Sequence, residues 1–378
     1  MSQSPPRPPS RVAVIFGGPS PEHDVSVLTG LQALRALRPV VGELRALFWS
    51  KSGEFFEVAT DLEGSAFADG APSGAAPVEL VVGAQSGFVV RRGGLRRGVE
   101  QLEIDAALNC CHGGPGEDGA LQGMLDLAGI AYSGPSAAGA ALGMDKLAFG
   151  GLVRDAGLPS LDRALLNASG APLPFDGPLI VKPRFGGSSI GIDVVADYAT
   201  ARARLHANVH LRRGAVVEPY RPDLSDLQIA VRTWPELQLS AIERPLKASP
   251  SGEILNYADK YVGGEGMSGA PRELPAVIPE KLAEQIRSIA TELVGLAGLR
   301  GVARVDFLAD GEQLYVNEVN TIPGSLSRHM FIDPPVPFAE LLSGLLDEAV
   351  RRPAAHFSVA GADGTVLRRA GSIAAKLA

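Results

Sequence analysis

The chain has 378 residues, of which 46% are apolar and 20% are charged, and its formal net charge is −7 at pH 7. One hydrophobic core rarely serves a chain of this length, so we expect two or three packed units. The acidic balance, with Lys and Arg scattered along the chain, argues against a nucleic-acid partner. No apolar run approaches the roughly 20 residues that cross a bilayer, so we expect no membrane segment.

Cys110 and Cys111 are the only cysteines. Two adjacent cysteines make no disulfide framework, and neither has the CxxC spacing of zinc or redox sites. We therefore expect a protein of the reducing cytoplasm. Residues 1–10 are rich in Pro and Ser and lack an apolar stretch, so they predict a disordered tail and no signal peptide.

The first unit is predicted to be βαβ. Residues 11–16 read as a buried strand, Gly17-Gly18 as a turn, and Ser20 as the cap of a helix that precedes a second strand over 44–50. In such folds ligands lie at the carboxyl ends of the strands. Glu22, in the first turn of this helix, is locally explained by the helix dipole alone. Residues 51–100 predict small strands and loops, with a hairpin turn at 93–97.

A second strand–loop–helix unit covers 104–129. Its glycines Gly114, Gly116 and Gly119 match the GxGxxG pattern of dinucleotide-binding folds. Two acidic residues inside the motif would face a pyrophosphate, and no acidic strand end follows about 20 residues later, so nicotinamide binding is disfavoured. His112, at the end of the strand, is either a ligand group or a capping histidine.

The next stretch carries two lysines and a glycine-serine loop. Two helices are predicted within 135–160, with Lys146 between them, and a lone lysine is usually only solvated. Lys182 ends an apolar strand. The loop 186–191, GGSSIG, follows and leads to another strand. Glycine backbone amides and serine hydroxyls can surround a phosphate, so we favour a phosphate-binding flap over a plain turn.

Three further strands are predicted over 226–234, 239–246 and 253–261. A glycine-rich loop without periodicity then predicts a lid over 262–271. An amphipathic helix is expected over 279–299. Residues 353–378 read as an appendage with a short hairpin at 361–366.

Between that helix and the C-terminus lies RVDFLADGEQLYVNEVN, residues 304–320. Asp-Gly between alternating apolar runs predicts a hairpin. Because residues two apart on a strand share a face, Asp306 lies beside Arg304, and Glu318 lies beside Asn320. Oxygen ligands of this kind suit Mg²⁺. The alternative is a solvated hairpin face that carries charges.

Several ordered segments together resemble a known family: GGPSPEHDVSVLTG, HGGPGEDGALQG, GMDK, VKPRFGGSSIG, ADKY, RVDF and NEVNTIPG. Over residues 11 to 350 the chain resembles D-alanine–D-alanine ligases of the ATP-grasp superfamily. The resemblance implies an α/β (α+β) ATP-grasp fold with ATP held between two sheets. The implied units are an N-terminal Rossmann-like substrate domain (11–134), a central subdomain with the flap (135–220), a C-terminal subdomain with lid and metal site (221–352), and an appendage (353–378).

The resemblance also implies site residues. Asp306, Glu318 and Asn320 match ligands of two Mg²⁺ ions, with Mn²⁺ as an alternative. The matched ATP contacts are Lys146, Lys182, Glu218, Asp226 and Lys260. The matched catalytic groups are Glu22, Ser188, Tyr261, Arg304 and the Gly324 amide. His112 and His329 are candidate substrate contacts. The implied substrates are ATP and D-amino acids, and the implied assembly is a homodimer.

Two positions depart from the family pattern. Asp226 stands where the family usually has glutamate, and His329 stands where it usually has the serine that holds the second amino acid's carboxylate. A histidine can also bind a carboxylate, with a charge that depends on pH near neutrality. Two alternatives to a D-alanine–D-alanine ligase therefore stay open: a related ligase with another second substrate, and a nucleotide-binding protein without ligase activity.

Overall fold

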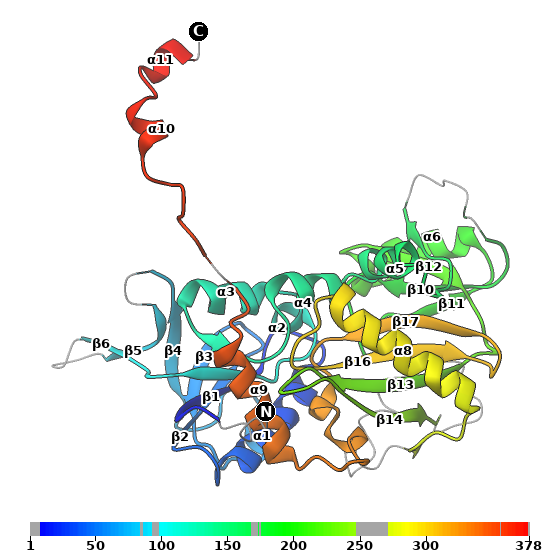
Figure 1. Ribbon diagram of the computed structural model, residues 1–378, viewed down its shortest axis with the longest axis horizontal. Coiled ribbons are helices and arrows are strands. Elements are labelled where there is room, and N and C mark those ends of the chain that lie inside the picture. The colour runs from blue at the N-terminus through cyan, green and yellow to red at the C-terminus, as the bar shows by residue number, and fades with distance from the viewer. Residues whose placement is uncertain are drawn as a thin grey trace.

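The computed structural model describes residues 8–83, 86–92, 98–167, 173, 175–246, 271–355 and 357–376. The described strands form an eight-stranded, a four-stranded and a five-stranded sheet. Figure 1 shows the eight-stranded sheet at one end of the molecule and the other two sheets at the opposite end. The mixed α/β architecture predicted from the sequence is confirmed.

The eight-stranded sheet is built on the predicted βαβ unit. β1 (Arg11–Gly17) and β2 (Glu43–Trp49) pair in parallel and are connected by α1 (His23–Leu37), which confirms that prediction. β7 (Ala106–Asn109) pairs in parallel with the other edge of β1, so the loops after β1 and β7 meet at one end of the sheet. The carboxyl ends of parallel strands are where α/β folds bind ligands.

The rest of this sheet consists of short strands, as predicted for residues 51–100. They are β3 (Phe55–Val58), β4 (Ala76–Val81), β5 (Gly87–Arg92), β6 (Gly98–Gln101) and β8 (Ala131–Tyr132), and the sheet order is β6-β5-β4-β3-β2-β1-β7-β8. The predicted turn at 93–97 lies outside the described residues. Besides α1, the helices of this unit are η1 (Gly64–Phe67), α2 (Gly114–Glu117) and α3 (Ala120–Ala128).

Ser20 does not cap α1, contrary to the prediction. The helix begins at His23, and Glu22 occupies the N-cap position. The Ser20 hydroxyl instead accepts a hydrogen bond from the Glu22 N–H at 3.1 Å, a local turn of the kind that competes with capping. This turn leaves the Glu22 carboxylate at the helix N-terminus, on the side where β1 ends.

The four-stranded sheet is antiparallel, in the order β11-β10-β12-β9. Its strands are β9 (Ala164–Leu166), β10 (Leu179–Pro183), β11 (Asp193–Val195) and β12 (Ala215–Pro219), and α6 (Tyr198–Ala207) and η2 (Val209–Leu211) follow β11. The predicted loop between β10 and β11 is confirmed, because the two strands pair on either side of it. The hydrophobic core of the four-stranded sheet includes Leu179, Val181, Val195, Ala201 and Val217.

The five-stranded sheet is antiparallel too, in the order β15-β14-β13-β16-β17. Its strands are β13 (Ser225–Arg232), β14 (Gln238–Pro245), β15 (Arg272–Glu273), β16 (Val302–Ala309) and β17 (Leu314–Asn320). α8 (Glu280–Leu296) lies across one face, as Figure 1 shows in yellow, and buries Leu282, Ile286 and Leu293 there. The predicted strand over 253–261 lies outside the described residues.

The remaining helices are α4 (Ala137–Met144), α5 (Lys146–Asp155), η4 (Gly324–Met330), α9 (Phe338–Arg351), α10 (Thr365–Arg368) and α11 (Ile373–Lys376). The hairpin predicted at 361–366 is wrong. The Asp363 carboxylate accepts hydrogen bonds from the N–H and hydroxyl of Thr365, both at 2.8 Å, and this turn starts α10. Within the part of the chain that the structure describes, no helix is long and apolar enough to cross a bilayer.

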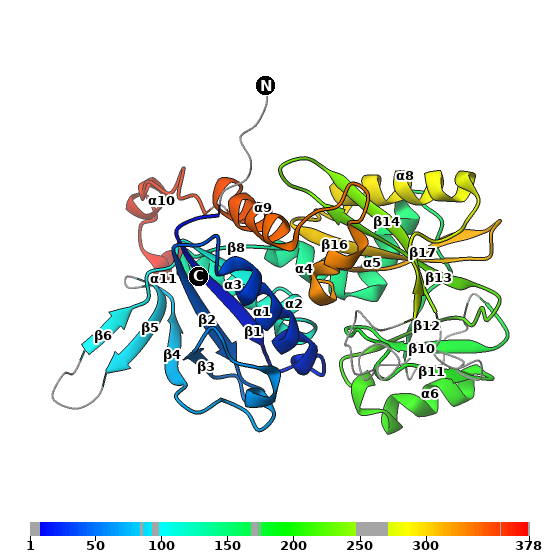
Figure 2. The same cartoon turned by 90° about the horizontal axis from the view of Figure 1, so that it is seen from below.

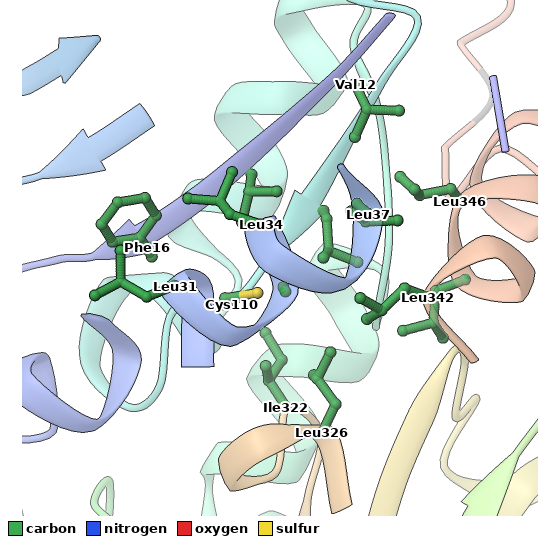
Figure 3. Close-up of a cluster of buried hydrophobic side chains, with 14 of the residues drawn as sticks. Val12, Phe16, Leu31, Leu34, Leu37, Cys110, Ile322, Leu326, Leu342 and Leu346 are labelled. Carbon is green, nitrogen blue, oxygen red and sulfur yellow. The ribbon is translucent and has the colours of Figure 1, made fainter. Parts of the chain in front are cut away.

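Helix α9 packs against the N-terminal unit. Figure 3 shows Leu342 and Leu346 of this helix near Leu37 of α1, with Ile322 from the loop after β17 and Leu326 of η4 in the same group. Burying one leucine side chain contributes about 1.5–3 kcal/mol. This shared core fixes the loop after β17 against the end of β1, where Glu22 stands.

Candidate active site

A cavity of about 460 Å³ lies between the four-stranded and five-stranded sheets, which Figure 2 shows facing each other. One wall is formed by β10, β12 and the loop that contains Gly186 and Gly187, and the other by β13, β16 and β17. Among the predicted site residues, the cavity is lined by Lys146, Lys182, Glu218, Asp226, Asp306 and Glu318. Six candidates that lie far apart in the sequence therefore converge on one space.

The hairpin of β16 and β17 pairs as predicted. Arg304 lies opposite Asn320, and Asp306 lies opposite Glu318. The Arg304 guanidinium donates to Asp306 at 2.6 and 2.7 Å, and the Asn320 amide donates to Asp306 at 3.1 Å. The convergence of these side chains on one face is confirmed, and because Asp306 and Glu318 line the cavity, the face is no solvated exterior surface.

A bulge at Asn317 makes this orientation possible. Asp306 pairs with Glu318 but Phe307 pairs with Val316, so Asn317 is the extra residue on β17. Without it, strict alternation would place Glu318 on the same face as Val316, which packs in the core beneath α8. The bulge turns the acidic end of β17 toward the cavity while Val316 and Val319 both remain buried.

Two of the three predicted lysines, Lys146 and Lys182, are held by partners at this cavity. The Lys182 ammonium donates to Glu218 at 2.8 Å and to the Asn317 side-chain oxygen at 3.1 Å. The Lys146 ammonium lies 3.0 Å from Glu318 and donates to the Gly186 carbonyl at 2.5 Å. Lys182 therefore connects the two walls of the cavity. Lys146, at the start of α5, contacts both the flap and β17.

Glu218 is fully buried and forms ion pairs with two cationic side chains. Its carboxylate is 2.8 Å from Lys182 and 2.6 Å from Arg163, and its side chain is 1% exposed. Burial opposes ionisation of Glu218, but the two cations outweigh it and hold the carboxyl pKa below its ordinary value. Glu218 therefore orients Lys182 as well as lining the cavity.

A second, small cavity of about 20 Å³ adjoins the first. It is lined by Glu22, Glu117 and Asn320, together with Lys146, Gly186, Gly187 and Glu318, and the last four also line the large cavity. Three glutamate side chains around so small a space, Glu22, Glu117 and Glu318, suit a cationic group such as an ammonium. The flap meets this cavity, because the Ser188 hydroxyl donates a hydrogen bond to Glu22.

Glu117 is a buried carboxyl that the sequence analysis did not select. It accepts from the N–H groups of Gly113 at 2.8 Å and Ile322 at 2.9 Å, and from the Thr321 hydroxyl at 3.2 Å. Burial and the neighbouring charge of Glu22 raise its pKa to about 7. Glu117 joins the loop after β7 to the loop after β17. Its place in the HGGPGEDG segment was the only local signal for it.

His112 and the Gly324 loop form one buried arrangement. The two ring nitrogens of His112 contact the Thr29 hydroxyl at 2.8 Å and the Ile322 carbonyl at 2.7 Å. Burial lowers the pKa of this imidazole to about 4, so it is neutral at pH 7. The Thr29 hydroxyl also accepts from the Ser325 N–H at 3.1 Å. With both nitrogens engaged by the protein, His112 orients the loop around Gly324.

His329, on η4, faces Glu243 of β14 with 2.7 Å between the ring nitrogen Nε2 and the carboxylate. Arg272 lies 3.6 Å from the same carboxylate. Burial opposes ionisation of Glu243, but the His329 hydrogen bond and the charges of His329, Arg272 and Arg304 hold its pKa below the ordinary value. His329 was a candidate from the sequence, whereas Glu243 was not, because only the folding of the five-stranded sheet brings Glu243 to His329.

Two predicted residues, Lys260 and Tyr261, lie outside the described residues, as does most of the predicted lid. Among the described residues, no group of three or more His, Cys, Asp and Glu side chains converges on a metal-sized site. The predicted metal ligands are instead two carboxylates and one amide, all offering oxygen atoms. This donor set suits a hard cation bound together with phosphate oxygens.

Two antiparallel sheets enclose a cavity of about 460 Å³ that two lysines, a glycine-serine flap and an acidic hairpin line or adjoin. This is the arrangement of an ATP-grasp enzyme. Two family descriptions match the chain: "D-ala D-ala ligase N-terminus" over residues 11–135 and "D-ala D-ala ligase C-terminus" over 152–346. The chain belongs to the D-alanine–D-alanine ligase family, whose members use ATP and a divalent metal ion.

Comparisons with individual proteins also support membership of this family. The chain is 32% identical to the D-alanine–D-alanine ligase of Bradyrhizobium sp. (strain ORS 278) over 342 residues, which cover 85% of this chain and 89% of that one. Its fold is similar to that of the D-alanine–D-alanine ligase from Coxiella burnetii, with a TM-score of 0.72 at 23% identity over 92% and 94% of the two chains. It is also similar to the VanG D-Ala:D-Ser ligase from Enterococcus faecalis, with a TM-score of 0.69 at 25% identity over 91% and 100%.

Proposed function

We propose that this enzyme joins two D-alanine molecules into a dipeptide, with ATP converted to ADP and phosphate, for peptidoglycan precursor synthesis. The observation that carries this proposal is the junction of the two cavities. Lys146, Gly186, Gly187 and Glu318 line both the large cavity and the small acidic one. A phosphoryl donor in the first space would meet an amino acid whose ammonium lies in the second.

The chemistry follows from this junction. A carboxylate is a poor acylating agent, so transfer of the γ-phosphoryl group of ATP to the first D-alanine would make an acyl phosphate. Such a transfer depends chiefly on positioning and on neutralising negative charge. Lys182 and Lys146 would bind phosphate oxygens, and Glu22 with Ser188 would hold the first substrate's ammonium. The ATP roles of Glu218, Asp226 and Lys260 and the substrate role of Tyr261 remain part of this proposal.

The metal ions would be bound at the acidic hairpin. Asp306, Glu318 and Asn320 would hold two Mg²⁺ ions, or Mn²⁺ in their place, because Asp306 and Glu318 line the large cavity and Asn320 lines the small cavity beside it. When bound, the ions neutralise charge on the phosphate oxygens. The hairpin itself contributes a fixed geometry, since Asp306 and Glu318 are paired across two strands.

The second amino acid's amine would then attack the acyl carbon and displace phosphate. Arg304 and the Gly324 amide would stabilise the oxyanion that develops in this step, and water must be excluded because it would hydrolyse the acyl phosphate. The acceptor's carboxylate would lie near His329, whose ring is held by Glu243.

A second candidate function is a ligase of the same chemistry with a different acceptor. His329 in place of the family's serine favours this alternative, and so does the likeness to a D-Ala:D-Ser ligase. A nucleotide-binding protein without ligase activity is the third candidate. The convergence of Arg304, Asp306, Glu318 and Asn320 beside two lysines argues against it.

The test is phosphate release from ATP and Mg²⁺ across D- and L-amino acids and D-lactate, with mass spectrometry of the products. The expected result is D-alanyl-D-alanine formed only with ATP and a divalent metal ion. If another acceptor gives a dipeptide or depsipeptide and D-alanine alone gives none, the enzyme is the second candidate, a ligase with a different acceptor. Nucleotide binding without turnover on any pair would leave only the third.

We further propose a cytoplasmic location, a homodimer, and the division of the chain at residues 134, 220 and 352. Light scattering after size-exclusion chromatography tests the dimer, which predicts twice the 39.3 kDa chain mass. Limited proteolysis tests the boundaries, because cleavage is expected first at exposed connections between packed units.

A further inference from the structure

Arg163 lies behind the large cavity and contacts three separate elements. Its Nε is 2.6 Å from Glu218 on β12, and its Nη2 donates to the Asn317 carbonyl on β17 at 2.9 Å. Its Nη1 donates to the Lys146 carbonyl at the start of α5. The Arg163 side chain is only 7% exposed. A buried guanidinium with partners on all sides fixes the spacing of the elements that it joins.

Asn317 completes this arrangement from the other wall. It is the bulged residue of β17, and its side-chain oxygen accepts from the Lys182 ammonium at 3.1 Å. Lys182 stands on β10 of the four-stranded sheet, so this hydrogen bond crosses the cavity between the sheets. The bulge therefore does two things at once: it turns Glu318 toward the cavity and presents Asn317 to Lys182.

We propose that Arg163, whose side chain is buried, and Asn317, which lines the cavity, form a bracket that positions the two lysines for the phosphates of ATP. A lysine side chain has about 2 kcal/mol of rotamer entropy, so an unsupported ammonium is poorly placed. Glu218 and Asn317 fix the Lys182 ammonium from opposite sheets, and Arg163 holds both of those partners. Arg163 also binds the backbone of Lys146. This inference rests on the proposed use of ATP, and not on which amino acids are joined.

The charges of the bracket explain why residue 317 is an amide. Lys182 and Arg163 supply two positive charges and Glu218 supplies one negative charge, so the group retains one positive charge for a phosphate. An aspartate at position 317 could keep the hydrogen bond to Lys182 but would cancel that charge. Asn317→Asp and Asn317→Leu therefore separate the charge of the bracket from its geometry.

The first test is the ATP dependence of turnover in Asn317→Leu. Loss of a hydrogen bond to a charged group predicts a rise in KM for ATP of roughly tenfold or more. The KM values for the amino acids, measured at saturating ATP, should change less than about twofold. Asn317→Asp should also weaken ATP binding, because the positive charge is lost. Unchanged KM for ATP in both variants would overturn the proposal.

The second test asks whether Asn317 acts through Lys182. If it does, Asn317→Leu should have little further effect on KM for ATP in a Lys182→Met background. A merely structural role for Asn317 would give additive losses, and additivity would refute the positioning role. Thermal melts of all three variants check that each is folded.

The third test measures nucleotide binding alone, with a non-hydrolysable ATP analogue and Mg²⁺ in isothermal titration calorimetry and no amino acid present. Arg163→Met should weaken analogue binding at least tenfold. Arg163→Lys should keep only part of the parent protein's affinity for the analogue, because one ammonium group cannot replace the planar guanidinium at all three partners. Arg287→Met is the matched control, since Arg287 pairs with Glu280 on the exposed surface of α8. Equal binding by Arg163→Met and the control would overturn the bracket. A failed ligation proposal leaves this measurement unaffected.

Discussion

The raised pKa of Glu117 gives a prediction that can be worked out in free energy. Its carboxyl pKa is about 7 in the folded protein, against an ordinary value of 4.5, because burial and the Glu22 charge outweigh three donated hydrogen bonds. A group whose pKa is raised on folding stabilises the fold below its unfolded pKa, and this contribution is lost as pH rises through the folded pKa. At about 1.4 kcal/mol per pKa unit, the full difference is roughly 3 kcal/mol.

The comparison is between the parent protein and Glu117→Gln, which carries no titrating group at this position. The advantage of the parent in unfolding free energy should fall by roughly 2 to 3 kcal/mol between pH 5 and pH 8. Urea denaturation at several pH values measures this difference. ¹³C NMR of labelled glutamate carboxyls gives the Glu117 pKa directly, as the resonance absent from the variant. In Glu22→Gln the pKa of Glu117 should drop toward its ordinary value. The reasoning would be refuted if the unfolding free energies of the parent and of Glu117→Gln changed in parallel with pH and the Glu117 carboxyl titrated near 4.5.

Four further predictions concern activity. Glu318→Gln should reduce turnover at least roughly 10²-fold with little change in melting temperature, as loss of charge stabilisation at the reaction centre does, and steady-state kinetics with a thermal melt check both. Lys182→Met should raise KM for ATP while the folded state persists, because Arg163 still neutralises Glu218; ATP titrations of rate measure this. His329→Ala should raise KM for the second amino acid and leave KM for ATP unchanged, which two-substrate kinetics separate. Removal of divalent ions with EDTA should stop phosphate release, and added Mg²⁺ should restore it.

Much of the site followed from local sequence patterns. The hairpin of residues 304–320 was predictable because Asp-Gly and alternating apolar residues specify a turn and a register. The flap and Lys182 were predictable because the glycine-serine loop directly follows an apolar strand. The bulge at Asn317 was also written in the sequence, since apolar residues at 314, 316 and 319 break a strict period of two. It was overlooked.

Other features had no local signal. Arg163 reads as an ordinary arginine before a short strand, and Glu243 as one charge on another strand. Arg163 meets Glu218 only because β9, which Arg163 precedes, pairs with β12 in the four-stranded sheet. Glu243 meets His329 only because η4 packs beside β14. In the appendage, by contrast, a local pattern was present but misleading. The turn at Asp363 begins helix α10, where a hairpin was predicted.

The sequence by itself determined the elements, the chemistry of the side chains and the order of the family's segments, because turn residues and apolar periodicity act over a few neighbouring positions. Only the tertiary structure decided which charges meet and how deeply they are buried. Those two quantities set the pairing of Lys182 with Glu218, the raised pKa of Glu117 and the partner of His329. They depend on contacts between residues that lie tens to hundreds of positions apart, and no local pattern contains them.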